Sequence, residues 1–429
     1  MTVQPIFSRA GTVPGTGSVQ AHWPVANTQF LAGAGGVVWP TAGTFGNFVI
    51  YINVAPGTAK SRTFAFTNIT TAASVTLVIS DAEVTERDIV NTLSVSVGDV
   101  LQVTHVGAGT PAAITECYIL AEFTSTNDGE SGYTMGHAAG NGALSGSGGP
   151  YYVEGPFAST TWTTSTPPAP ENIVAVAGNV TSMSVRSSTT PGASKSWDFW
   201  LVKNGVLQDG AGGTVNTHVN TGNVTTGVTG TFTLPVSPGD RLSMKATGVS
   251  APASSRIQAG ITLTATADGE CQISCSHGSS ASTSVVNYGW AVTAATAGWD
   301  ATETNRDEPM FVGSFTLAAM YVLLGAAPGA GNSWQFDMRR DAATPGGALS
   351  VLISDSATTG SDVTGSLALD DGHLWGIKST PTSGPAIGST PQFAWRIAAP
   401  TVTTTGMAFS PFVGSVVNVG AGSSGPFTG

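Results

Sequence analysis

Short runs of alternating apolar and polar residues, bounded by Gly, Pro, Asn and Ser, recur along the whole chain. Such alternation places every second side chain on one face of a β-strand, whereas an amphipathic helix needs apolar residues every three or four positions. No helical period of apolar residues persists over ten positions in any part of the sequence. The pattern therefore predicts an all-β protein built from antiparallel sheets.

Three stretches share one strand–turn–strand pattern around a Pro-Gly pair: "FVIYINVAPGTAKSRTFAF", "MSVRSSTTPGASKSWDFWL" and "MYVLLGAAPGAGNSWQFDM". When the glycines are aligned, the residue seven before is β-branched and the residue seven after is Phe. These aligned sets are Gly57, Gly192 and Gly329; Ile50, Val185 and Val322; and Phe64, Phe199 and Phe336. The shared parity predicts three hairpins with one buried face each, and it places Trp197 and Trp334 in the core or between domains.

A second block, "VSVGDVLQV", "LPVSPGDRLSM" or "LALDDGHLWGI", follows each hairpin, and a proline and another alternating run follow it. We therefore expect three tandem homologous antiparallel β-sandwich domains of jelly-roll type. Trp39, Trp162 and Trp299 are assigned to their opening strands. The expected domains are 1–124, 125–265 and 266–397, and residues 398–429 are expected to pack on the first domain or on a neighbouring chain, with a frayed tail as the alternative.

Composition narrows the class of protein. Only 10% of residues are charged and 41% are hydrophobic, so Gly, Ser, Thr and Ala cover much of the surface, which suits β-sandwiches. The net charge of −11, without a cluster of Lys and Arg, argues against nucleic-acid binding. Neither a signal peptide nor a membrane-spanning apolar run is expected, and three cysteines fit synthesis in a reducing cytoplasm.

One stretch, "PGASKSW" around Lys195, resembles part of a phosphate-binding loop because a glycine and a Lys-Ser pair occur close together. No glycine precedes the lysine, and the alternating, aromatic "SWDFWL" that follows predicts a strand, whereas a phosphate loop needs a helix there. The matching residues in the other repeats are Lys60 and Asn332. A hairpin turn explains all three copies, and no cofactor is expected.

Two acid pairs, Asp81 with Asp88 and Asp355 with Asp362, have the same separation in the first and third repeats. Such pairs are candidates for a calcium site or for glycosidase chemistry. The second repeat lacks both acids, so capping of turns between strands is the preferred interpretation. We expect no catalytic residues and no enzyme, and these four aspartates are the weak metal candidates.

Other candidates for chemistry are isolated. In "CQISCSH", Cys271, Cys275 and His277 share one face of a predicted strand, and we expect two buried thiols and a surface histidine, with a metal site as the alternative. Tyr133, Tyr151, Tyr152 and Trp162 lie in glycine-rich segments. If exposed, these aromatic side chains are candidate contacts for a glycan or a partner protein.

The three-fold pattern of "APGxGxSWxF", "ISDxxTxxxD" and "VxxGDxLxxxxxxxxxPA" resembles the tandem β-domains of structural proteins in tailed bacteriophages. These are head decoration proteins, head fibres and tail fibres, and the resemblance covers residues 45–123, 180–265 and 315–397. It implies a non-enzymatic virion surface protein that is assembled in the host cytoplasm and contacts capsid or tail proteins. The alternative is a host-attachment module that binds surface glycans. The repeats also predict either an intrachain pseudo-threefold set or a homo-oligomer such as a trimer.

Overall fold

The chain folds entirely into β-structure in the part that the computed structural model describes. A short 3-10 turn, η1 (Ala211–Gly213), interrupts the β-structure in the second third of the chain. The described residues are 2–10, 13, 15, 17–23, 27–28, 36–135, 144–154, 164, 171–225, 228–277, 281–291, 299–303, 308–309, 314–386 and 391–398. Residues 399–429, which include nearly all of the expected C-terminal segment, lie outside them.

The strands form six sheets, two in each third of the chain. In the first pair, one sheet has the order β3 (Asn27–Thr28), β1 (Val3–Ala10), β11 (Cys117–Ser125), β5 (Gly43–Ile52) and β8 (Thr85–Asp88), with β9 (Leu93–Val95) also on β5. The other sheet has the order β2 (Ser18–His22), β10 (Val100–Ala108), β6 (Gly57–Asn68) and β7 (Ala73–Asp81), with β4 (Val37–Val38) also on β10. All of these pairings are antiparallel except the short one between β1 and β3.

The second pair of sheets repeats this order. One sheet runs β12 (Glu130–Met135), β21 (Ile257–Ala265), β15 (Gly178–Ser187) and β19 (Val228–Val236). Its partner runs β13 (Tyr151–Glu154), β20 (Arg241–Val249), β16 (Ser196–Lys203) and β17 (Val206–Leu207), with β14 (Asn172–Ile173) on β20 and β18 (Val219–Asn220) on β16.

The third pair follows the same plan. One sheet runs β22 (Cys271–Ser276), β31 (Gln392–Ile397), β25 (Phe315–Leu323) and β28 (Thr359–Asp362), with β29 (Leu367–Leu369) on β25. Its partner runs β23 (Asn287–Gly289), β30 (Leu374–Thr382), β26 (Gly329–Arg340) and β27 (Ser350–Asp355), with β24 (Glu308–Pro309) on β30. We call the sheets that contain β1, β12 and β22 the inner sheets, and their partners the outer sheets.

Backbone geometry repeats at the aligned turns. Gly57, Gly192 and Gly329 have φ of 96°, 109° and 97°, a region that a residue with a Cβ rarely adopts. Gly57 and Gly329 are the first residues of β6 and β26, and β16 begins at Ser196, directly after Lys195. A strand therefore follows the turn in all three copies, as predicted. Lys195 therefore lies in a turn between two strands, as predicted, but the expectation of a hairpin was wrong. β5, β15 and β25 belong to the inner sheets and β6, β16 and β26 to the outer sheets, so each Pro-Gly turn crosses from one sheet of the sandwich to the other.

Each pair of sheets encloses one apolar core, as in a β-sandwich. Trp197 and Trp334 are 0% and 5% exposed, so their predicted burial is confirmed. The first pair has Arg62 at this place, also fully buried, with its Nη1 3.0 Å from Nε2 of His105. Burial and the neighbouring guanidinium lower the pKa of His105 to about 4, which keeps the imidazole neutral at pH 7.

One sequence alignment was wrong. The backbone of Trp39 bonds to Asp99 and Gly98 as that of Val174 bonds to Asp240 and Gly239. Trp39 therefore corresponds to Val174, because both residues follow the short strand β4 or β14. The spacing to the Pro-Gly pair misled the alignment, since loop lengths before the Pro-Gly turn differ between repeats. Trp162 lies outside the described residues.

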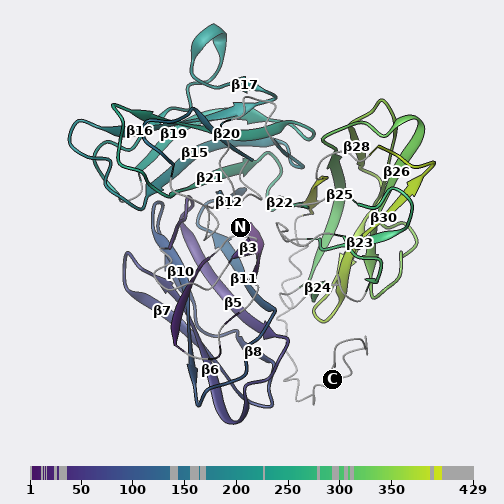
Figure 1. The fold of residues 1–429 in the computed structure, drawn as a ribbon, viewed down its shortest axis with the longest axis horizontal. Coiled ribbons are helices and arrows are strands. Elements are labelled where there is room, and N and C mark those ends of the chain that lie inside the picture. Colours follow the sequence, from purple (N-terminus) through teal and green to yellow (C-terminus); the bar gives the residue numbers. More distant parts are fainter. Residues whose placement is uncertain are drawn as a thin grey trace.

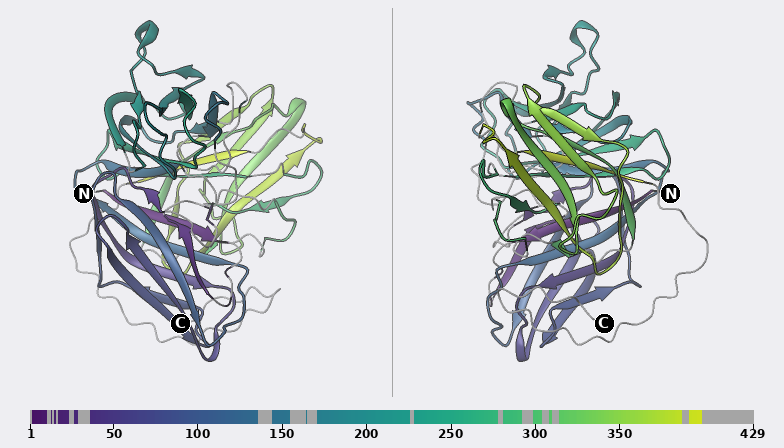
Figure 2. Two further views of the ribbon diagram at one scale, coloured as in Figure 1. Left: turned by 60° about the vertical axis from the view of Figure 1, so that its left-hand side comes forward. Right: turned by 90° about the vertical axis from the view of Figure 1, so that its right-hand side faces the viewer.

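The three pairs of sheets surround a common centre, near which β12 and β22 lie (Figures 1 and 2). The first strands of the inner sheets contact one another there. Gln4 on β1 exchanges two hydrogen bonds with the backbone of Gly132 on β12, at 2.9 and 3.0 Å. Tyr133 Oη on β12 accepts one from the backbone N–H of Gln272 on β22, at 2.9 Å. The thiol of Cys271 on β22 lies 3.9 Å from the carbonyl oxygen of Val3 on β1.

The contact between the first and second pairs is mainly polar. Thr262 on β21 donates to the carbonyl of Pro40 at 2.8 Å, and its hydroxyl lies 3.0 Å from that of Thr41. Arg186 on β15 donates to the carbonyl of Gly36 at 2.8 Å. Gly132 lies so close to Trp39 that an added Cβ would be 2.5 Å from its ring. The small residue therefore lets the two pairs approach closely.

The other two contacts are more apolar. Ile173 and Ala175 of the second pair pack on Ala394 of the third. Phe7 of the first pair packs edge-on against Phe315 of the third, with ring centroids 6.3 Å apart, and the third core also includes Val49, Tyr118 and Leu120 of the first pair. At the rim of this contact Arg87 forms a two-bond ion pair with Asp371, at 2.7 and 2.8 Å. Each pair of sheets thus contacts both others.

Tyr133→Phe tests the contact at the centre. The substitution removes the acceptor of a buried backbone N–H, which costs about 1–3 kcal/mol when nothing replaces it. We expect a lower midpoint of thermal unfolding for the full chain, followed by circular dichroism. Tyr152→Phe is the control, because this tyrosine packs on Val202 within the outer sheet of the same pair, away from the centre. A Tyr133→Phe chain as stable as wild type would contradict this role.

Candidate functional site

The four predicted aspartates serve as turn caps. Asp81 and Asp355 each adopt a left-handed backbone, with φ of 54° and 55°. Their Oδ1 atoms accept hydrogen bonds from the backbone N–H of Ala59, at 2.7 Å, and of Gly331, at 2.8 Å. The two carboxylates thus fasten the same tight turn in the first and third pairs of sheets.

Asp88 and Asp362 cap the next turn. Asp362 accepts from the backbone N–H groups of Thr364 and Gly365, each at 2.9 Å, and of Ser350 at 3.0 Å. Burial alone would raise the pKa of Asp362, but these hydrogen bonds outweigh it and hold the pKa below its usual value. Asp88 accepts similar bonds from Val90 and Asn91, and its pKa is lowered in the same way. Among the described residues, no three His, Cys, Asp or Glu side chains gather closely enough to hold a metal ion.

The predicted aromatic contacts are buried where they can be described. Tyr133, Tyr151 and Tyr152 are 6%, 8% and 8% exposed and lie on strands β12 and β13, so the expectation of exposed loop residues was wrong for all three. Tyr133 and Tyr151 belong to the second core, and Tyr152 packs on Val202. Trp162 lies outside the described residues. Glycine-rich composition misled this prediction, because these segments contribute strands to the sheets.

The thiols and imidazole of "CQISCSH" also point into the protein. Cys271, Cys275 and His277 are all 0% exposed, so they share one face as predicted, but the surface position expected for His277 was wrong. Its ring stacks on Trp299 at 4.3 Å, and its Nε2 lies 3.0 Å from the carbonyl oxygen of Trp290. Burial raises the pKa of the Cys271 thiol to about 12, which makes it a poor nucleophile at pH 7.

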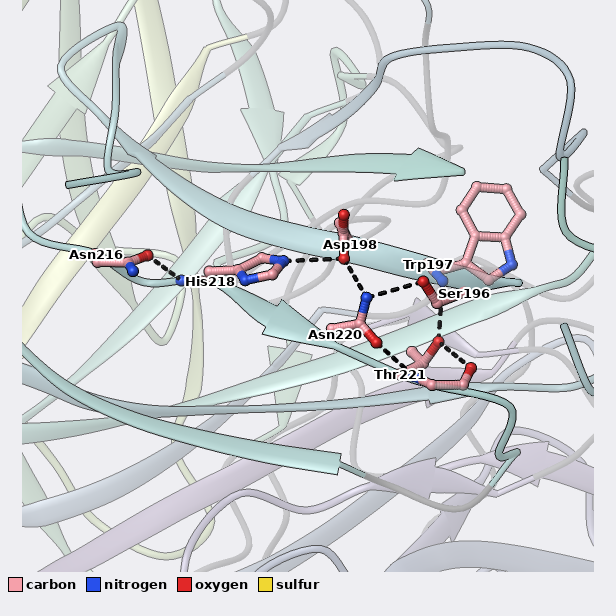
Figure 3. A network of polar contacts seen from close by, with 8 residues as sticks. Ser196, Trp197, Asp198, Asn216, His218, Asn220 and Thr221 are labelled. Carbon is pink, nitrogen blue, oxygen red and sulfur yellow. Dashed lines mark hydrogen bonds and ion pairs between the residues drawn. The ribbon is translucent and has the colours of Figure 1, made fainter. Parts of the chain in front are cut away.

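A cluster of polar and aromatic side chains that the sequence did not single out lies on the outer sheet of the second pair. Figure 3 shows its polar part, which includes Ser196, Asp198 and Asn220. Trp197, Phe199 and Leu201 on β16 point into the core. Ser196, Asp198 and Trp200 therefore point away from it, because side chains alternate along a strand. We call the outward group the Trp200 cluster. It consists of Ser196, Asp198, Trp200, His218, Asn220 and Lys245.

Two threonines bring the neighbouring segment into place. Thr217 and Thr221 lie on either side of β18, and their hydroxyls accept hydrogen bonds from the backbone N–H of Leu201, at 2.8 Å, and of Trp197, at 3.0 Å. These bonds satisfy donors of β16 at its edge. The residues between the threonines, His218 to Asn220, consequently lie beside Asp198 and Trp200.

Asp198 is the centre of a short chain of hydrogen bonds (Figure 3). Its Oδ1 lies 2.9 Å from Nε2 of His218 and accepts from Nδ2 of Asn220 at 2.5 Å. The same Nδ2 donates to the hydroxyl of Ser196 at 2.8 Å. The Asn220 amide thus separates Ser196 from the Asp198–His218 pair.

Trp200 lies between a cation and an imidazole. The His218 ring is nearly parallel to the indole, at 20° and 4.9 Å between centroids. Nζ of Lys245, on the adjacent strand β20, lies 5.2 Å from the indole centroid. Trp200 is half-buried and the His218 side chain is 37% exposed, so the cluster is accessible from solvent.

The cluster is suited to binding rather than to nucleophilic catalysis. A serine nucleophile needs its hydroxyl within hydrogen-bond reach of a base, whereas Ser196 bonds to Asn220 and the Nε2 of His218 faces Asp198. What the cluster offers is a carboxylate, an amide, an imidazole and an ammonium group around aromatic rings. Such groups recognise hydroxyl-bearing or amide-bearing ligands.

The sequence predicts that Asp198 and Trp200 point outward, because Trp197 and Phe199 are assigned to the core and side chains alternate along a strand. It does not predict their partners. His218 lies after a long connection that contains β17 and η1, and the pairing of its segment with β16 depends on the register of the strands.

The chain matches no protein-family model, and no curated protein sequence is detectably similar to it. In the described residues, no helix has the length and apolarity that crossing a membrane requires.

Asp362→Ala tests the turn caps. The loss of several backbone hydrogen bonds is expected to cost about 1 kcal/mol at pH 7, while Asp362→Asn keeps an acceptor and should cost less. Because the pKa of Asp362 is lowered by folding, its ionised form stabilises the fold above the ordinary aspartate value of 3.8. That contribution is lost as the pH falls through the lowered pKa, so the difference between wild type and Asp362→Asn should disappear in acid.

Calcium separates the two interpretations of these aspartates. The wild-type melting temperature, followed by circular dichroism, should not change when millimolar calcium replaces chelator. A calcium-dependent rise that Asp362→Asn removes would show that the aspartates bind the ion, in contradiction to a purely capping role.

Proposed function

We propose that the chain is a non-enzymatic structural protein on the surface of a tailed-bacteriophage particle, as a capsid decoration protein, a head fibre or a tail-attached protein. The observation that carries this proposal is the strand order, which is the same in three pairs of sheets. In the first pair, β1 pairs with β11, β2 with β10, β5 with β8 and β6 with β7. The first strand of the unit thus pairs with its last strand, the second with the last but one, and the pairing continues inward to the adjacent strands β6 and β7.

This nested pairing is what rolling up one long antiparallel hairpin produces, and it is the plan of a jelly roll. We therefore interpret the chain as three tandem jelly-roll domains, with the predicted boundaries 1–124, 125–265 and 266–397. Jelly rolls are common in viral capsid proteins and lectins. A fold is no proof of function, so the fold gives support by analogy only.

The contacts among the three units favour a single-chain pseudo-threefold ring. β4 of the first unit contacts β21 and β15 of the second, and β14 of the second contacts β31 and β25 of the third. The apolar contact of the third unit with β5 and β11 continues this cycle. Such a ring matches the symmetry of a threefold or trimeric partner site on a particle.

Surface composition and the aspartates add further support. A surface with few charges and much Thr, Ser and Gly suits an extracellular particle released by cell lysis. The acid pairs that suggested calcium or glycosidase chemistry act as backbone caps in both units that carry them. Their spacing is thereby explained without catalysis.

The test is to locate the chain in a lysate. Particles from cells that carry this sequence are banded on a caesium chloride gradient, analysed by mass spectrometry and labelled with gold-conjugated antibodies against the chain. We expect the chain to band with the particles and the gold to label their outer surface, on the head or on the tail. If the chain stays in the soluble fraction while particles lack it, the proposal is wrong.

A further inference from the structure

We propose that the Trp200 cluster binds a neutral pyranose of a surface polysaccharide. This site lies on β16, β18 and β20 of the outer sheet of the second unit, whereas the units meet through their inner sheets, and the inference does not depend on a virion location. Figure 3 shows its polar residues Asp198, His218 and Asn220. A sugar needs apolar contact for its C–H faces and paired donors and acceptors for its hydroxyls. The Trp200 cluster offers both within one small area.

The aromatic surface comes from two rings. Trp200 and His218 are stacked nearly parallel, so together they form one aromatic block that Lys245 flanks on the adjacent strand. The imidazole is the more exposed part of this block, with 37% of its side chain accessible. The C–H face of a pyranose can pack on the exposed side of His218 and along the edge of the indole.

The polar groups around the rings retain bonding capacity. Oδ1 of Asp198 is occupied by His218 and Asn220, but Oδ2 makes no hydrogen bond to any other described residue. The Lys245 ammonium likewise has no carboxylate partner in the described part of the chain and keeps three donors. A carboxylate oxygen and an ammonium group on the two sides of a ring can accept from and donate to the hydroxyls of one sugar.

Two hydroxyl groups on β20 border the Trp200 cluster. The outward positions of this strand are Ser243, Lys245 and Thr247, and they lie opposite Val202, Trp200 and Asp198. Ser243 is 0% exposed, and neither its Oγ nor Oγ1 of Thr247 has a hydrogen-bond partner within the described chain. Both hydroxyl oxygens are covered by the chain itself, so the polar contacts that a sugar can reach are those of Asp198, His218 and Lys245.

The cluster is held in place before a ligand arrives. Asp198, Asn220 and Ser196 fix one another, and Thr217 and Thr221 fasten both ends of the segment that carries His218. Affinity is then not reduced by the entropy of ordering these side chains. The hydrogen bonds thus serve to preorganise a binding surface.

The other units lack this arrangement, so the fold does not require it. The strand pairings place Ala65 of the first unit and Asp337 of the third at the position of Trp200. Lys378 of the third unit corresponds to Lys245 but faces Asp337 across the strands. A polar cluster present in one copy of three points to a ligand rather than to a structural need.

Charge selects the class of sugar. Asp198 and Lys245 roughly cancel each other, and the whole chain carries a net charge of −11, which repels polyanions. A neutral hexose or deoxyhexose unit is therefore favoured over an acidic one.

The experiment is a glycan array of neutral and acidic oligosaccharides probed with the full-length chain, with titration calorimetry on the best neutral binder. We expect binding to a neutral pyranose that changes little between 0.05 and about 0.5 M salt. Trp200→Ala and the nearly isosteric Asp198→Asn should each weaken it about tenfold or more, as loss of a central contact does. Lys245→Ala should weaken it, whereas the matched control Lys378→Ala should not.

Three outcomes would overturn the inference. They are absence of any neutral ligand, binding that Trp200→Ala and Asp198→Asn both leave unchanged, and a preference for acidic sugars. Thermal melts of each variant verify folding, and Asp198→Asn keeps the test informative if Trp200→Ala unfolds. Because the location of the chain on particles is measured separately, failure to bind a neutral sugar would leave the proposed virion role unaffected. Absence of the chain from particles would likewise leave the sugar-binding inference unaffected.

Discussion

Strands β11, β21 and β31 of the inner sheets are buried on both faces, and this constraint governs the architecture. In a two-layer sandwich one face of each sheet meets the core and the other meets water. Strands β11, β21 and β31 have almost no exposed side chain on either face. Their second faces carry residues such as Leu120, Thr262 and Ala394, which another unit covers. When the three inner sheets face one another around one centre, each covers the second face of another.

The three contacts have different chemistry, which gives each unit a defined neighbour. Threonine hydroxyls dominate between the first and second units, aliphatic side chains between the second and third, and aromatic rings between the third and first. The last contact also buries Glu122 near Arg87 and Asp371. Burial raises the pKa of Glu122, opposed in part by a hydrogen bond with Asn47 and by the Arg87 charge. A mismatched neighbour would leave such groups buried without partners.

Much of the fold follows from sequence periodicity because strand parity and turns are local, although periodicity did not show that the Pro-Gly turns connect two different sheets. The parity of Phe64, Phe199 and Phe336 was enough to place Trp197 and Trp334 in cores and to interpret Lys195 as part of a turn. Long-range register was not accessible, and so Trp39 was aligned with the wrong residues and Tyr133 was expected on the surface. Only part of the Trp200 cluster could be predicted from the sequence, because strand parity places Trp200 on the outward face. Its partners His218 and Lys245 come from other strands, whose pairing depends on packing of the whole sheet.

We propose that one chain closes into a ring of three equivalent units. Thr58, Ala193 and Ala330 are exposed and occupy the same place in the three aligned turns. The native cysteines are fully buried, so cysteines introduced pairwise at these positions can be spin-labelled selectively. Pulsed electron spin resonance on the three double variants measures each separation in solution. The ring predicts three similar, narrow distances, whereas a 58–330 distance much longer than the other two would show units arranged in a line and would contradict it.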